Sequence, residues 1–149
     1  MNIDIDEKQI EGVELLTDIF GRFPSFHDAE ILTLGLSSGN YAAPVTLEVS
    51  IHVFEMTSEI VNNKYVLKNH TLVTFEFDDV RNLQMEGFGH QNSLQELSIV
   101  DIKHLQLEGI KFEVKFPGNV GLEAKFMCRA IRVLSAEPFT PRRPYATRD

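Results

Sequence analysis

The first regular pattern of apolar side chains in this chain has a helical period. Apolar residues recur at spacings of three and four while the acidic residues fall mostly on the other side: Ile10, Val13, Leu16 and Phe20. Asp6 can cap the start of such a helix, and Gly21 can end it. The pattern predicts one amphipathic helix over residues 7–20.

From residue 32 onward the period changes to two, which is typical of strands with one buried face. Alternation over 32–36, 45–53, 73–77 and 83–85 predicts four strands. Turn residues at 37–40 join the first two into a hairpin. The inward side chains of these strands are predicted to be Leu32, Leu34, Leu36, Val45, Leu47, Val49, Ile51, Val53, Val73, Phe75, Phe77, Leu83 and Met85.

Three later strands are predicted over 95–107, 109–116 and 121–135, but their alternation changes phase twice. A turn or bulge at Glu108-Gly109 explains the first change, and a similar slip separates Cys128 from Ile131. The predicted fold class is α+β, with one N-terminal helix packed on a mainly antiparallel sheet of six to seven strands. We expect a single domain over 1–137 and an extended tail, rich in Pro and Arg, over 138–149.

Composition narrows the classes of partner. The chain of 149 residues has 14 basic and 22 acidic residues, a net charge of -8, which disfavours binding to nucleic acid. It has no apolar run long enough to span a membrane, and its N-terminus is acidic where a secretory signal is basic. These features predict a cytoplasmic protein without membrane partners. The one cysteine, Cys128, lies at an inward strand position and is expected to be a core residue.

The segment 23–30 concentrates candidate chemistry at the junction between helix and sheet. Its His27, Asp28 and Glu30 are residue types that move protons or bind cations. If a strand begins at His27, however, alternation sends the two carboxylates to one face and the imidazole to the other. We therefore interpret the segment as a structural clasp made by Phe23, Pro24, Phe26 and His27.

The rest of the chain lacks a recognisable catalytic or metal motif. Its histidines do not have the paired spacing of zinc sites, and nucleophile-elbow, phosphate-loop and dinucleotide patterns are missing from the sequence. We predict no catalytic residue, no metal ligand and no cofactor. A loop over 87–93 displays His90, Gln91 and Asn92, which can recognise a partner. The alternative is a metal-dependent enzyme or a small-ligand-binding module centred on His27, Asp28 and His90.

Three segments carry a family resemblance: Ile19-Phe20-Gly21-Arg22-Phe23-Pro24-Ser25-Phe26-His27-Asp28-Ala29-Glu30-Ile31, Ile51-His52-Val53-Phe54-Glu55-Met56-Thr57, and Leu83-Gln84-Met85-Glu86-Gly87-Phe88-Gly89-His90-Gln91-Asn92. The chain resembles the immunity protein 50 family of bacterial polymorphic toxin systems. Its first segment is similar to W-P-S-F-H-D-A-E, with Phe23 in place of Trp, and its third to G-F-N-H-Q-N, with Gly89 in place of Asn.

This resemblance implies a small, non-catalytic cytoplasmic protein that binds and neutralises a cognate toxin. Because the chain is acidic, we expect a basic toxin that is steered electrostatically onto it. The residues expected to contact the toxin are polar or acidic: Asp28, Glu30, Asp78, Glu86, His90, Gln91 and Asn92. The sequence gives no prediction of oligomeric state.

Overall fold

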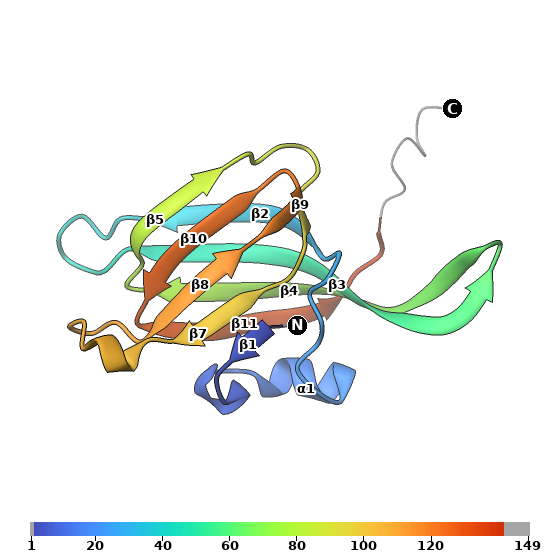
Figure 1. Ribbon diagram of the computed structural model, residues 1–149, viewed down its shortest axis with the longest axis horizontal. Helices are drawn as coiled ribbons and strands as arrows, with labels where there is room; N and C mark the ends of the chain where they lie inside the picture. The colour runs from blue at the N-terminus through green and yellow to red at the C-terminus, as the bar shows by residue number, and fades with distance from the viewer. Residues whose placement is uncertain (1, 142–149) are drawn as a thin grey trace.

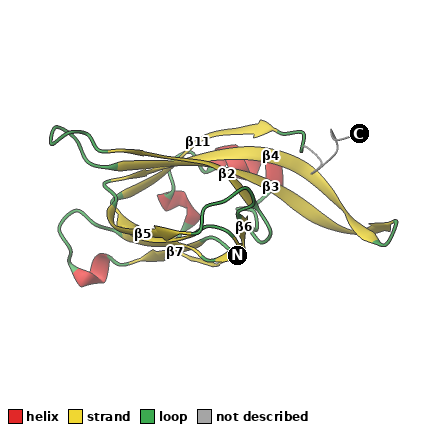
Figure 2. Ribbon diagram, turned by 90° about the horizontal axis from the view of Figure 1, so that it is seen from above, coloured by secondary structure: helices red, strands yellow, loops and turns green. Residues whose placement is uncertain are grey.

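The computed structural model describes residues 2–141, and for residues 2–4 only the backbone. Two sheets pack face to face as a sandwich (Figures 1 and 2). In strand order, sheet A contains β1 (Asn2–Asp4), β7 (Ser98–Asp101), β8 (Phe112–Phe116), β10 (Glu123–Cys128) and β5 (Arg81–Glu86). Sheet B contains β11 (Ala130–Pro138), β4 (Lys64–Asp78), β3 (Thr46–Val61), β2 (Glu30–Ser37), β6 (Ser93–Leu94) and β9 (Gly118–Val120).

The strand pairs are antiparallel apart from β1 with β7, as the sequence predicts in general terms. The prediction of a single sheet of six to seven strands is wrong. The physical reason lies in the core, where Phe77 of sheet B meets aromatic residues of sheet A. The ring of Phe77 lies 5.9 Å from that of Phe116 and 5.0 Å from that of Phe126. One short helix cannot cover so many inward side chains, and the second sheet buries them instead.

The predicted helix over 7–20 is wrong in its first half. Residues Glu7–Gln9 form a 3-10 turn, η1, and the helix α1 spans only Glu14–Phe20. Between them the chain pairs with β11: the N–H of Glu11 donates to the carbonyl of Ile131 at 3.0 Å, and the N–H of Val133 donates to the carbonyl of Glu11 at 2.7 Å. Gly12 has a φ of 79°, and a Cβ there would lie 2.5 Å from the Val133 carbonyl oxygen, so only glycine fits.

The helix α1 ends as the sequence predicts, because Gly21 adopts the left-handed conformation at φ 75°. Leu16 and Phe20 are buried on its inner side. Figure 1 shows α1 beside β11 and β1, at one edge of the sandwich. The helix thus closes that edge, whereas the prediction laid it over a sheet face.

The predicted strand over 121–135 is two strands in different sheets. β10 ends at Cys128 in sheet A, and β11 begins at Ala130 in sheet B. At the crossing the N–H of Arg129 donates to the carbonyl of Asp78 at 2.9 Å, and its guanidinium forms an ion pair with the Asp78 carboxylate. The phase slip in the sequence therefore marks a change of sheet rather than a bulge.

Two other strand predictions need correction. The strand predicted over 95–107 is strand only at 98–101, after which Lys103–Leu105 form the 3-10 turn η2 and a turn follows at 108–109. In β2 the register shifts between Ile31 and Thr33, which leaves Leu32 exposed. Leu36 and Val45 are also exposed, so the predicted inward face of this hairpin is only partly buried.

Strands β3 and β4 continue past the body of the sandwich as a two-stranded projection (Figure 1, right). Pairing of β3 with β2 ends at His52, and pairing of β4 with β11 ends at Thr71. We call residues 54–70 the arm. Its tip is a tight turn in which Asn62 and Asn63 have φ values of 52° and 65°.

The predicted C-terminal tail is described only at its start. Pro138 is the last residue of β11, and the N–H of Phe139 donates to the carbonyl of His70 at 3.0 Å. Residues 142–149 lie outside the described residues.

Candidate functional site

The junction 23–30 is a turn rather than the start of a strand. Asp28 has a φ of 64°, and β2 begins only at Glu30. As a result His27 and Asp28 do not diverge as predicted: His27 Nε2 lies 3.5 Å from Asp28 Oδ2, and both side chains are about half exposed. The other ring nitrogen, Nδ1, donates to the carbonyl of Gln95 at 2.9 Å.

The aromatic part of the same segment lies in the core. Phe23, Pro24 and Phe26 are buried. The Phe26 ring lies 5.6 Å from that of Phe23 and 5.8 Å from that of Phe75 in β4. The apolar side chains of the junction thus bind the chain that follows α1 to sheet B.

The first and third of the segments that carry the family resemblance meet in space, since the N–H of Ile31 donates to the carbonyl of Asn92 at 2.9 Å. The residues beside them are paired as well. The N–H of Asp28 donates to the carbonyl of Leu94 at 2.9 Å, and the N–H of Leu94 donates to the carbonyl of Ala29 at 2.8 Å. From a third segment, the side-chain amide of Asn119 donates to Asp28 Oδ1 at 3.3 Å and to the Leu94 carbonyl at 3.2 Å. Three segments far apart in the sequence therefore form one end of the sandwich.

Asn92 holds this end together. The sequence predicted that Asn92 lies on the surface, but the residue is buried. Its side chain is 3% exposed. Oδ1 accepts the N–H groups of Gly89 at 2.9 Å and Leu122 at 3.2 Å, while Nδ2 donates to the carbonyls of Gly89 at 2.8 Å and Ile31 at 3.4 Å. Glu30 is also used internally, because its Oε1 accepts the backbone N–H of Asn92 at 2.7 Å. The Asn92 amide and the Glu30 Oε1 atom are therefore already hydrogen-bonded within the protein.

Three of the other residues expected to contact a partner are exposed near this end. The side chains of Glu86, His90 and Gln91 make no hydrogen bond or ion pair within residues 2–141. The Asp28 side chain, which accepts a hydrogen bond from Asn119 at the same end of the sandwich, is about half exposed. Asp78 lies elsewhere, at the crossing between the sheets, where Arg129 neutralises it.

The alternative site centred on His27, Asp28 and His90 is not assembled. In the part of the chain that the structure describes, no hydrogen bond or ion pair joins His90 to the other two residues. Nor does any group of three or more His, Cys, Asp and Glu there have an arrangement that could hold a metal ion. Cys128 is buried, and burial raises the pKa of its thiol to about 12, with a smaller contribution from the charge of Asp79.

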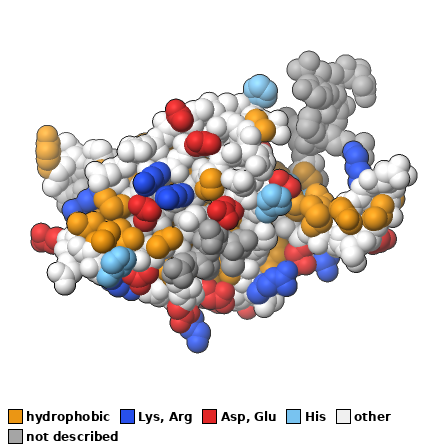
Figure 3. Space-filling view, viewed as in Figure 1, with side chains coloured by type: hydrophobic (Ala, Val, Ile, Leu, Met, Phe, Trp, Pro, Cys, Tyr) orange, Lys and Arg blue, Asp and Glu red, His pale blue; other side chains and the backbone are white. Residues whose placement is uncertain are grey.

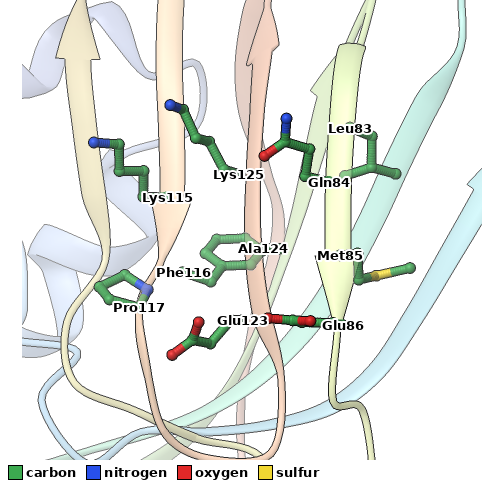
Figure 4. A pocket seen from close by; sticks show the side chains of 10 residues that line it. All are labelled: Leu83, Gln84, Met85, Glu86, Lys115, Phe116, Pro117, Glu123, Ala124 and Lys125. Carbon is green, nitrogen blue, oxygen red and sulfur yellow. The ribbon is translucent and has the colours of Figure 1, made fainter.

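A shallow groove of about 660 Å³ crosses the outer face of sheet A over β5, β8 and β10. Figure 4 shows Lys115 and Lys125 at one end of it and Glu123 and Glu86 at the other. The lysine ammonium groups lie 3.7 and 3.9 Å from the carboxylate of Glu113. Glu86 lies directly opposite Glu123 in the register, and among the described residues neither carboxylate has an ion-pair partner. Figure 3 shows the same mixture of charges on this face.

Sequence reasoning missed a second feature, an aromatic cluster on the outer face of sheet B at the base of the arm. His52 Nε2 and His70 Nδ1 share a hydrogen bond of 2.9 Å. The His52 ring also lies 5.6 Å from that of Phe54 and 4.7 Å from that of Phe139. Burial, and secondarily the charge of His70, lower the pKa of His52 below its usual 6.5. An alternating His-Phe pattern at 52–54 was visible in the sequence, but its partners come from elsewhere: His70 from β4, and Phe139 from just after β11.

Within residues 2–141 no helix is long and apolar enough to cross a membrane. No curated protein and no solved structure gave a significant match to the chain. The family model described as Immunity protein 50 matches residues 12–139, which include all three segments that carry the resemblance, the arm and all of β11. The chain therefore belongs to the Immunity protein 50 family.

Proposed function

We propose that this protein binds and neutralises a cognate toxin of a bacterial polymorphic toxin system and has no catalytic activity of its own. The observation that carries the proposal is the match to the Immunity protein 50 family over residues 12–139. In this proposal the two proteins meet in the cytoplasm, and the toxin is the basic partner of an acidic chain with net charge -8.

The contact surface in this proposal is the acidic end of the sheet A groove and the loop beside it. Like charges directly opposite each other destabilise an antiparallel pair, yet Glu86 and Glu123 are opposed and unpaired within the described residues. A Lys or Arg of the toxin would relieve this repulsion. Asp28, His90 and Gln91 add exposed polar groups. Since the Asn92 side chain bonds both backbone groups of Gly89, the backbone that carries His90 and Gln91 is held in place before binding.

Co-purification from the native host, or with the product of the adjacent gene, tests the role. We expect one toxin to be retained stoichiometrically. Recovery of the protein alone, under conditions in which the toxin is expressed, would contradict the proposal.

The surface is tested separately, by association kinetics with that toxin. The double variant Glu86→Gln/Glu123→Gln should lower the association rate by about tenfold at low salt and weaken its salt dependence. The matched control Glu48→Gln/Glu137→Gln removes the same charge from exposed positions on sheet B and should change the rate little. Equal effects of the two double variants would reject the groove as the contact surface while leaving toxin binding itself intact. A rate that does not depend on salt would reject electrostatic steering.

A further inference from the structure

We propose that the arm is a dimerisation element, in which one apolar face packs against the same face of a second copy of this chain. The face consists of Met56 and Ile60 from β3 and Tyr65 and Leu67 from β4, and we call it the arm face. This inference does not depend on toxin binding.

The register of the hairpin puts these four side chains on one side. Met56 is the partner of Leu67, and Ile60 is the partner of Tyr65. Because residues 65 and 67 are two positions apart on one strand, they point the same way, and so do the residues opposite them. Their exposed fractions are 55% for Met56, 61% for Ile60, 55% for Tyr65 and 36% for Leu67.

The charged residues of the arm belong to the other side of the hairpin. Glu55 is opposite Lys68, at 3.8 Å between carboxylate and ammonium, and Lys64 is opposite Val61. The arm therefore has the pattern of a strand pair with one buried and one wet face. Nothing among the described residues covers its apolar face, and a two-stranded hairpin is at best marginally stable in water when it stands alone.

The arm face continues the aromatic cluster at the base of the arm. Alternation along β3 places His52, Phe54 and Met56 on the same side of the strand. Phe54 in turn lies 5.9 Å from the ring of His70, next to Phe139. Figure 3 shows hydrophobic side chains gathered along the arm at the right of the molecule. A continuous apolar strip of this kind is typical of a protein–protein interface.

The charge distribution favours a second copy as the occupant. The chain has a net charge of -8, so two bodies repel each other, but the arm carries Glu55 and Glu59 against Lys64 and Lys68 and is neutral. Two arms can meet without that repulsion. A basic toxin, in contrast, finds no opposite charge on the arm face and is attracted to the acidic groove instead.

In a two-fold symmetric dimer the same surface of each copy forms the interface. The arm face suits such a dimer because it contains no charged residue that would meet its own copy and repel it. Antiparallel pairing of two β4 edges, centred on Val66, would place Lys64 of one copy against Lys68 of the other. The β3 edge is interrupted by the register shift between Met56 and Ile60. Packing by the face is therefore the contact that the arm permits.

Sedimentation of the purified full chain over a concentration series tests the proposal. The wild-type protein should form a dimer. Ile60→Glu puts a charge into the apolar arm face and should raise the dimer dissociation constant by about a hundredfold or more. The matched control is Val61→Glu, which makes the same change at the next residue, on the opposite face and facing Lys64. It should dimerise like the wild type.

Thermal unfolding of each variant shows whether it is folded. If Ile60→Glu does not fold, amide hydrogen exchange of the wild-type arm provides the second measurement, and it should slow as protein concentration rises. A wild-type protein that stays monomeric throughout, equal dimerisation of the two Glu variants, or arm exchange that is independent of concentration would each overturn the proposal. In the first case a toxin surface becomes the candidate occupant of the arm face.

Discussion

Replacing Asn92 by alanine should cost about 3 kcal/mol of unfolding free energy. The change removes all four hydrogen bonds of a side chain that is 3% exposed. A typical intramolecular hydrogen bond contributes about 0.5–1.5 kcal/mol net, and more when a buried partner is left unsatisfied. The bond to the Ile31 carbonyl, at 3.4 Å, is long and should contribute least. Loss of the bond from the buried N–H of Leu122 should cost the most unfolding free energy, because that N–H is left without a partner.

Urea unfolding followed by circular dichroism measures this cost. With a slope of about 1–3 kcal/mol/M for a domain of this size, the midpoint should fall by about 1–3 M while the slope stays unchanged. The control is Gln91→Ala, next in the chain, whose exposed side chain makes no hydrogen bond within residues 2–141, and which should change stability by no more than about 0.5 kcal/mol. If the two variants were equally stable, Asn92 would not hold the loop, and the preorganised surface beside it would lose its basis.

Three further predictions concern the core and its titrating groups. Phe26→Ala should lower the unfolding free energy by about 3–5 kcal/mol in the same assay, because its fully buried ring lies between Phe23 and Phe75; a loss below about 1 kcal/mol would contradict its role in the junction. Because the pKa of His52 is lowered in the folded protein, the unfolded chain binds the proton more readily, and stability present above pH 6.5 is lost as the pH falls. His52→Gln should therefore flatten the profile of unfolding free energy against pH. An unchanged profile would refute the argument. Cys128, with its pKa raised to about 12, should resist thiol reagents at neutral pH until the protein unfolds, and rapid labelling of the native protein would show that the thiol is accessible.

Much of the strand content follows from the sequence, but the sheet to which each strand belongs does not. Alternation correctly gave the buried positions Leu47, Val49 and Ile51 in β3. The alternation of apolar and polar residues shows that one face of a strand is buried. It does not show which element covers that face. At Arg129 the chain changes sheet, and the sequence shows this only as a phase slip, the same signal that a bulge gives. The helical period at residue 10 was likewise overridden by backbone pairing of Glu11 with β11.

For the residues of the candidate site, the sequence shows the chemical type but not the surroundings of each side chain. Asn92 lies in a polar, glycine-rich segment typical of a surface loop, and its burial depends on Ile31 and Leu122 from other strands. The contact between His27 and Asp28 depends on a positive φ at Asp28, which alternation does not anticipate. The arm was missed because apolar residues are adjacent in both of its strands, at Ile60-Val61 and at Tyr65-Val66-Leu67, so the sequence shows no period of two there.

The crossing at Arg129 also determines when in its synthesis the chain can fold. β11 covers the edge of β4, from Ala130 opposite Asp78 to Pro138 opposite Thr71, and it holds Glu11 by its backbone. A nascent chain that ends before Ala130 has neither contact, so the outer edge of β4 and the backbone of Glu11 stay without these partners until β11 has been made. Sandwiches dominated by such distant pairings fold in milliseconds to seconds rather than microseconds. Sheet B is therefore complete only after residues 130–138 have left the ribosome.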